Sequence, residues 1–309
     1  MRFSCHRRFL TGVAGISLSL GWLGLPNNVL SAELQPHRAI YDMRLSSAES
    51  GSKISDVTGR MVYELSGSAC AGFTVDLRFV VMTTDGDGAE SVTDIRTTYY
   101  EAPDNGKLTF AYQTFIDDYL AEEARGTATN QPTKVDVDLV GPDVKQLSFD
   151  GSIMFPLQHL HSMIDAAASG QHFMATKLYD GSATGDTLYD SSVVIGRQLP
   201  DPLAQRSDHA LMPKGLARAD AWPVSIAYFD LNNKVRGERS PDYQLRAVLH
   251  ENGVSRSMHL NYGLFQLDGA LVELDLKPIV PMSACNTSAS LEEEVSVPLG
   301  DVIAVEPIR

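Results

Sequence analysis

Cysteine is scarce in this sequence, and the scarcity limits the chemistry that the chain can carry. The three cysteines, Cys5, Cys70 and Cys285, do not have the C-x-x-C spacing of a redox site, and they are too few for a structural zinc site. After residue 32 the sequence also lacks the G-x-S-x-G motif of a hydrolase nucleophile and a glycine-rich phosphate loop. We therefore expect no catalytic, cofactor-binding or metal-binding residues, no cofactor, and a protein that is not an enzyme.

Basic side chains and long apolar segments are scarce as well. Lysine and arginine total 25 against 39 aspartate and glutamate residues, which gives a formal net charge of −14. A chain this acidic is repelled by nucleic acid and by anionic lipid surfaces, so we expect no nucleic-acid partner. After residue 32 no segment approaches the roughly 18 apolar residues of a transmembrane helix, so we do not expect an integral membrane protein.

The N-terminus has the three parts of a secretory signal peptide. Arginines at positions 2, 7 and 8 precede an uncharged run from Phe9 to Leu25, and small residues at Ser31 and Ala32 suit cleavage after Ala32. The alternative is a membrane anchor, but the run is only about 17 residues long and is rich in glycine and serine. Residues 1–32 are thus predicted to be a removable signal peptide, and the mature chain has 22 basic and 39 acidic side chains, a formal charge of −17.

Export changes the interpretation of the cysteines. Cleavage after Ala32 removes Cys5 and leaves Cys70 and Cys285. Two cysteines in an exported chain most simply form one disulfide, here closing a very long loop. The alternative is a pair of free thiols with a role in redox chemistry or metal binding.

Alternation of apolar and polar residues with a period of two dominates the mature chain and predicts strands with one buried face. Turn residues between the runs predict antiparallel hairpins, and about a dozen strands favour a barrel, a curled sheet or a sandwich. The inward faces are rich in Leu, Met, Phe and Tyr, and we expect them to fill a solid core. The apolar faces include Val57-Gly59-Met61-Tyr63-Leu65, Phe73-Val75-Leu77-Phe79-Val81, Val224-Ile226-Tyr228, Tyr243-Leu245-Ala247-Leu249 and Met258-Leu260-Tyr262, and the turns are 85–88, 104–106, 251–253 and 267–269.

One segment has helical periodicity instead. It begins at Phe155 with proline as the next residue, is rich in alanine, and stops before Gly170. We predict one amphipathic helix packed on or inside the sheet. Its apolar stripe contains Leu157, Leu160, Ile164 and Ala168.

His159 and His161 form an H-x-H pair inside this predicted helix. Such a pair can bind zinc from a strand, but residues two apart on a helix point in different directions. We therefore do not expect a metal site at these histidines.

The mature chain contains no repeat of fixed length and no long linker. We expect a single β domain over residues 33–285. Residues 286–309 lack strong alternation and contain Glu292-Glu293-Glu294, so we expect an acidic C-terminal segment there.

Several short stretches stand out by their order and spacing: His37–Tyr41, Gly59–Glu64, Gly67–Cys70, Phe155-Pro156 with His159, Tyr179–Ser182, Trp222–Val224 and Glu251–Arg256. With these stretches the chain resembles the bacterial cell-envelope integrity protein B (EipB) family of periplasmic proteins, formerly of unknown function. The family usually carries a tyrosine or phenylalanine just before its Glu-Asn-Gly turn, and this chain has His250 there. The resemblance extends from about His37 to Cys285.

The resemblance implies a large antiparallel sheet curled into an open, spiral-like barrel with a helix near its middle. It also implies a disulfide between Cys70 and Cys285. For function it implies a periplasmic protein that maintains the envelope of Gram-negative bacteria, and it supplies neither an enzyme activity nor a confirmed ligand.

We therefore expect a non-enzymatic periplasmic protein that supports envelope integrity through contacts with other envelope proteins or components, which the sequence does not identify. The alternative is a carrier or binding module for a lipid or other apolar ligand, because a curled sheet can enclose a cavity. A hydrolase is a third and more distant alternative, which would need serine, histidine and aspartate side chains within hydrogen-bond reach.

Overall fold

The computed structural model describes residues 33–200, 216, 219–233, 239–280 and 285. These residues belong to one compact unit, Ser31–Arg309. The predicted signal peptide, residues 1–32, and the predicted acidic segment, residues 286–309, lie outside the described residues.

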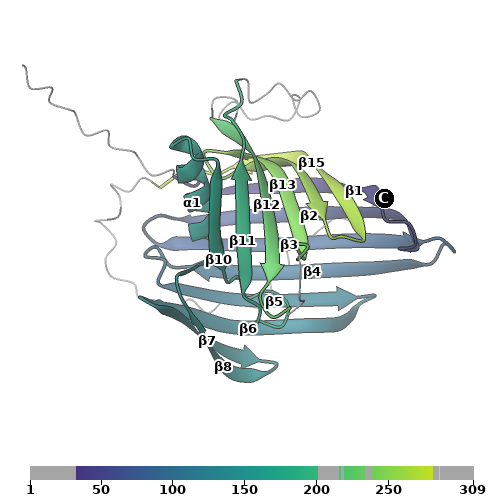
Figure 1. Cartoon of the computed structure of the whole chain (residues 1–309), viewed down its shortest axis with the longest axis horizontal. Coiled ribbons are helices and arrows are strands. Elements are labelled where there is room, and N and C mark those ends of the chain that lie inside the picture. The colour runs from purple at the N-terminus through teal and green to yellow at the C-terminus, as the bar shows by residue number, and fades with distance from the viewer. Residues whose placement is uncertain (1–32, 201–215, 217–218, 234–238, 281–284, 286–309) are drawn as a thin grey trace, which may run out of the picture. The chain divides into compact units, whose positions relative to one another are not determined.

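A single 15-stranded sheet makes up most of the described structure (Figure 1). The strands are β1 (His37–Ala48), β2 (Ile54–Ser68), β3 (Gly72–Asp85), β4 (Glu90–Glu101), β5 (Lys107–Ile116), β6 (Tyr119–Gln131), β7 (Lys134–Gly141), β8 (Val144–Asp150), β9 (Ile153–Met154), β10 (Phe173–Leu178), β11 (Tyr189–Ile195), β12 (Ala221–Asp230), β13 (Tyr243–His250), β14 (Ser255–Asn261) and β15 (Phe265–Leu276).

Strand β1 lies inside the sheet and divides it into two arms. It pairs antiparallel with β2 on one side and with β15, the last of the described strands, on the other. From β1 the first arm continues in chain order to β8, and the second runs backwards from β15 to β9. All neighbours are antiparallel except β9 and β10, which are parallel.

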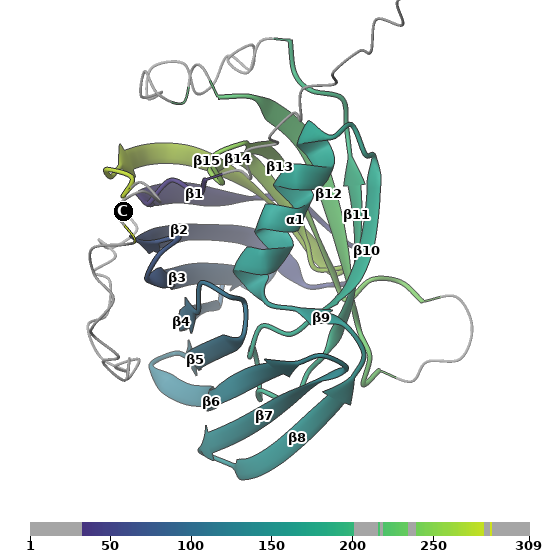
Figure 2. The same ribbon diagram turned by 90° about the vertical axis from the view of Figure 1, so that its left-hand side faces the viewer.

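The sheet is curled, so that strands β10–β13 of the second arm cross in front of strands β2–β5 of the first (Figure 1). Helix α1 (Pro156–Ala168) lies on the inner side of the curl (Figure 2). Strands β8 and β9 end the strand order and are not paired with each other. The predicted fold is confirmed: a mainly β protein whose antiparallel sheet forms an open, barrel-like curl around one amphipathic helix.

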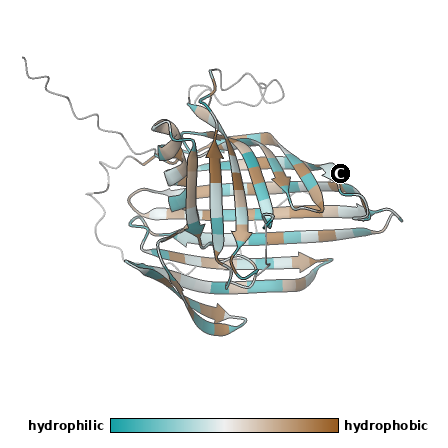
Figure 3. Ribbon diagram, in the orientation of Figure 1, coloured by the Kyte–Doolittle hydropathy of each residue, from teal (hydrophilic) through white to brown (hydrophobic). Residues whose placement is uncertain are grey.

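The period of two in the sequence appears as alternating burial along the strands. In β1, His37, Ala39, Tyr41 and Met43 are buried and the residues between them are only partly buried. Hydrophobic and hydrophilic residues alternate along the strands in Figure 3. The register aligns these faces, because Tyr41 is paired with Met61 of β2. Apolar residues from neighbouring strands therefore share the inner face.

Three of the four predicted turns are confirmed, since residues 85–88, 104–106 and 251–253 join consecutive strands. The turn predicted at Leu267–Gly269 is wrong, because these residues lie inside β15. A Cβ atom on Gly269 would lie 2.6 Å from the sulfur of Met43 on the paired strand β1. This glycine therefore permits a close approach in the sheet interior, and the real turn follows Tyr262.

Helix α1 occupies the segment in which a helix was predicted. Gly170 follows it with a φ of 76°, a left-handed conformation that glycine adopts without strain. The predicted stripe is only partly correct: Leu157 and Ile164 are buried, whereas Ala168 is exposed.

Cys70 and Cys285 are joined by a disulfide, with their Cα atoms 5.3 Å apart. Cys70 lies in the turn between β2 and β3, while Cys285 follows the last strand. The bond therefore ties the chain beyond β15 to the first arm of the sheet. A cross-link over a separation of 215 residues removes much conformational freedom from the unfolded chain.

Replacing both cysteines, as Cys70→Ser with Cys285→Ser, should lower the free energy of unfolding by about 2–5 kcal/mol, because the unfolded chain gains entropy. Urea unfolding of the oxidised protein measures the change. Wild type treated with reductant should match the double variant, and the variant should not respond to reductant. Equal unfolding midpoints for oxidised wild type and variant would contradict the expectation.

Candidate ligand cavity

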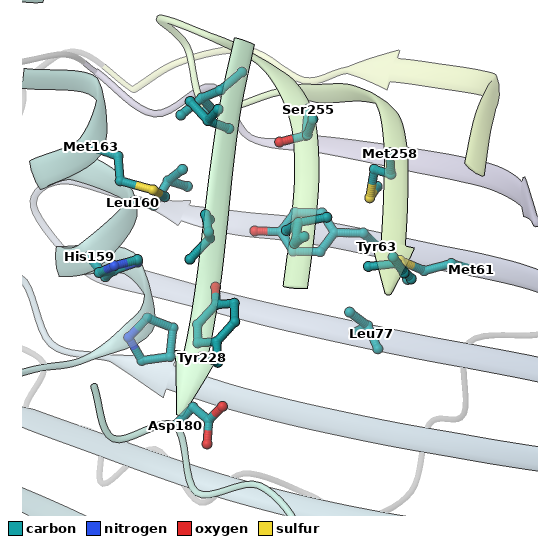
Figure 4. A pocket seen from close by; sticks show the side chains of 18 of the residues that line it. Met61, Tyr63, Leu77, His159, Leu160, Met163, Asp180, Tyr228, Ser255 and Met258 are labelled. Atoms are coloured by element: carbon teal, nitrogen blue, oxygen red, sulfur yellow. The ribbon is translucent and has the colours of Figure 1, made fainter. Parts of the chain in front are cut away.

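The inner face of the curl surrounds a cavity of about 370 Å³ (Figure 4). Its walls come from β1–β4 of the first arm, from β10 with the turn after it and β12–β14 of the second, and from helix α1. We expected these apolar faces to fill a solid core, but the two arms and the helix do not meet completely. The cavity lies at the lower end of the volume range of small-molecule sites.

The lining is mostly apolar, and alternation in the strands explains which side chains reach it. Val224, Ile226 and Tyr228 of β12 line the cavity, as do residues 243, 245, 247 and 249 of β13. The sequence analysis placed these residues on common apolar faces. Helix α1 adds Leu160 and Met163, which Figure 4 shows on the same side of the cavity as His159.

Asp180 supplies a carboxyl group in this apolar lining. Its Oδ1 accepts a hydrogen bond from the backbone N–H of Ser182 at 3.0 Å. Gly181 makes this turn possible, because it has a φ of 70° and a Cβ there would lie 2.4 Å from the Phe110 ring. Burial raises the pKa of Asp180 above its ordinary value.

His159 lies in the cavity wall with Nε2 3.0 Å from the Ser191 hydroxyl oxygen, a hydrogen-bonding distance. Burial lowers the pKa of His159 to about 4, so the imidazole is neutral at physiological pH. His161, two residues along the helix, does not line the cavity. The pair is thus separated as expected for a helix.

A buried Ser–His pair is also two-thirds of a hydrolytic triad. In the part of the chain that the structure describes, no carboxylate is hydrogen-bonded to His159, and Ser191 does not line the cavity. A nucleophile needs both an oriented base and access to substrate. The arrangement does not provide them, and the pair fastens α1 to strand β11.

Glu101, the last residue of β4, holds the beginning of helix α1. Its two carboxylate oxygens accept hydrogen bonds from the backbone N–H groups of Leu157 and Gln158, both at 2.8 Å. The first helical residue, Pro156, has no N–H to satisfy, and Phe155 offers no side-chain cap. A carboxyl group from a distant strand therefore caps the helix and holds this part of the cavity wall in position.

Burial raises the pKa of Glu101 to about 7, although the two backbone hydrogen bonds oppose the shift. Glu101 is only 3% exposed. The neutral acid is therefore favoured in the folded state at pH values at which the unfolded chain is already ionised.

His250, which stands where the resembling family has an aromatic residue, has a specific partner. Its Nε2 accepts a hydrogen bond from Nε of Arg256 at 3.1 Å, and both side chains are fully buried. Burial and the positive charge of Arg256 lower the pKa of His250 to about 4. A neutral imidazole can accept this hydrogen bond, whereas a phenylalanine cannot.

Sequence reasoning did not identify Glu101, Asp180 or Ser191. For Asp180 the signal was its place in the Tyr-Asp-Gly-Ser stretch that carries the family resemblance. Glu101 and Ser191 contact α1 from strands far along the chain, and no local pattern marks them. In the described residues, no group of three or more His, Cys, Asp or Glu side chains is arranged to hold a metal ion.

None of the helices within the described ranges has the length and apolar character needed to cross a membrane.

Comparison with known proteins gives consistent matches. A family model described as EipB-like matches residues 30–278. The cell envelope integrity protein EipB of Brucella abortus (strain 2308) is 36% identical over 263 residues, which cover 85% of this chain and 91% of that protein. The crystal structure of a beta-barrel-like protein with a domain of unknown function, also from Brucella abortus, has a TM-score of 0.75 and 38% identity, covering 80% of this chain and 100% of that one.

The substitution Glu101→Gln should change how stability depends on pH. In wild type, the neutral Glu101 side chain stabilises the folded state. This contribution is lost as the pH rises from 4.5, the pKa of the group in the unfolded chain, through about 7, its pKa in the folded protein. The amide of the variant does not ionise and avoids this loss. The free energy of unfolding of the variant relative to that of wild type should therefore rise by about 3 kcal/mol between about pH 4.5 and about pH 8.

Urea unfolding at the two pH values measures this difference. The variant should be the less stable protein at low pH, because an amide accepts only one of the two N–H groups. Glu90→Gln, the same change at an exposed position on β4, controls for the lost charge. An unchanged pH dependence in Glu101→Gln would refute the role assigned to this carboxyl group.

Proposed function

Because this chain belongs to the EipB-like family, we propose that it acts in the periplasm as a non-enzymatic protein that supports the integrity of the cell envelope. The observation that carries the proposal is its 36% identity, over 85% of the chain, to a protein named for cell envelope integrity. The match covers 85% of this chain and 91% of the relative, so it supports a shared role in cell envelope integrity as well as a shared fold.

Two features support the periplasm as the place of action. The N-terminal 32 residues have the charge and hydropathy pattern of a secretory signal. The disulfide between Cys70 and Cys285 suits an oxidising compartment. Neither feature depends on the family match.

The protein would act through contacts with other envelope proteins or components. A mature formal charge of −17 opposes binding to anionic lipid headgroups and to nucleic acid. It favours partners that present basic or uncharged surfaces.

Deleting the gene in its native host should increase sensitivity to bile-salt detergents and to cell-wall antibiotics, measured as colony formation on graded plates. The full-length gene should restore resistance, and a version lacking residues 1–32 should not, because the protein would remain in the cytoplasm. The same truncated protein behind an unrelated secretion signal should restore resistance again. Normal sensitivity of the deletion strain would count against the proposed role.

A second function is favoured by the cavity itself: a carrier or binding module for a lipid or another apolar molecule. A solid core would have served stability better, since unfilled apolar volume in a protein interior is costly. A mostly apolar cavity of about 370 Å³ with a few polar groups has the character of a small-molecule site.

Protein purified gently from the periplasm should carry an apolar ligand, detected by native mass spectrometry and identified after solvent extraction. Leu245→Trp, which fills the cavity from β13, should reduce the ligand-bound fraction. Gln244→Trp places the same bulk on the opposite face of that strand and should leave the bound fraction unchanged. The second function would be contradicted if wild-type protein carried no ligand as purified and also bound no medium-chain alcohol, such as 1-decanol, after incubation.

A further inference from the structure

We propose that the cavity binds an amphiphile whose head is an organic ammonium cation, with the head against Asp180 and nearby tyrosine rings and the chain among methionine and leucine side chains. The proposal rests on the second function above, an apolar ligand in this cavity, and adds the chemical class of the ligand. It comes from the way in which acidic, aromatic and aliphatic groups are arranged along the lining.

Asp180 has no cationic partner among the described residues. Its carboxyl group is hydrogen-bonded to the turn at Ser182, and no lysine or arginine among the described residues lines the cavity. The two histidines of the lining, His37 and His159, both have pKa values lowered by burial and are neutral. An ionised Asp180 without a counter-ion is unfavourable in this apolar lining, in agreement with its raised pKa, and a bound cation would stabilise the ionised form.

Tyrosine rings gather on the same side of the cavity as Asp180. Figure 4 shows Tyr228 beside the Asp180 carboxyl group. The ring of Tyr228 stacks on Tyr243 with centroids 4.3 Å apart, and Tyr189 stands edge-on to both. The faces of such rings carry negative potential, and grouped aromatic rings are the usual way in which proteins hold quaternary ammonium groups.

The remaining lining suits an alkyl chain. Met61, Leu77 and Met258 lie across the cavity from Leu160 and Met163 of α1 (Figure 4). Methionine side chains are flexible and adapt to irregular apolar shapes. At roughly 30 Å³ per water-sized group, 370 Å³ accommodates about a dozen such groups, which is the scale of a medium-length chain with its head.

The same arrangement disfavours anionic amphiphiles. A fatty acid or a phosphate head would bring a second negative charge close to Asp180, with no basic side chain in the described lining to balance it. A neutral alcohol would fill the apolar part but would leave the carboxylate uncompensated. The negative charge of Asp180 therefore favours a cationic head, and the apolar walls favour an alkyl tail.

Isothermal titration calorimetry with four probes tests the proposal: decyltrimethylammonium, 1-decanol, decanoate and tetramethylammonium. Wild type should bind decyltrimethylammonium at least about tenfold more tightly than decanoate or tetramethylammonium. Asp180→Asn keeps the acceptor for the Ser182 N–H and should weaken binding of this cation by about tenfold while leaving binding of 1-decanol unchanged.

Two further variants complete the design. Tyr228→Leu removes one ring and should weaken binding of decyltrimethylammonium more than binding of 1-decanol. This variant gives a second test if Asp180→Asn does not fold. Asp190→Asn makes the same charge change at an exposed position on β11 and should bind all probes as wild type does.

Equal affinity of wild type and Asp180→Asn for decyltrimethylammonium, with 1-decanol still bound, would overturn the ammonium head and leave the apolar-ligand function standing. Tetramethylammonium bound as tightly as decyltrimethylammonium would overturn the amphiphile. Decanoate bound more tightly than the cation would overturn the charge selection. Failure of every probe to bind would overturn the apolar-ligand function itself.

Discussion

Strand β1 uses both of its edges for backbone hydrogen bonds, to β2 on one side and to β15 on the other. These neighbours are the next strand and the last of the described strands, so the two halves of the described sequence extend from β1 as separate arms. A sheet of fifteen twisted strands coils, and the coil brings the apolar face of one arm over that of the other. The helix, the cavity and the open edges all follow from this central pairing.

The interior that the arms enclose disfavours charge. Burial raises the pKa values of Glu101 and Asp180 and lowers those of His159 and His250, so each shift favours the neutral form. Glu101 is kept there because it joins the first arm to the start of α1. Asp180 has no comparable structural task beyond its own turn. That difference distinguishes a carboxyl group that builds the wall of the cavity from one that is available to a ligand.

The sequence predicted the local structure well, because alternation depends only on neighbouring residues. Val224, Ile226 and Tyr228 share a face in the structure as expected, and the helix begins after Phe155 as its proline indicated. The failure at Leu267–Gly269 has a non-local cause, since that glycine accommodates Met43 from a strand at the other end of the chain.

The candidate site was less predictable for the same reason. Alternation tells which side chains point inward, but not how far apart the two arms lie, so a solid core and a cavity have the same sequence pattern. The contacts of Glu101 with Leu157 and of Ser191 with His159 join residues that no local motif connects. Alternation marked much of the apolar lining, whereas the polar lining residues His159 and Asp180 were marked only by the H-x-H pair and by stretches that carry the family resemblance.

The position of β1 also sets the order in which the molecule can assemble. The pairing of His37 with Leu276 joins the beginning and the end of the described sheet, so the centre of the sheet cannot be completed until β15 has been synthesised. Contacts between such distant residues are slow to form, because closing the intervening chain costs entropy before any contact compensates for it. Slow closure of this kind suits the proposed export, because a chain that folds late can be threaded through a translocation channel for longer.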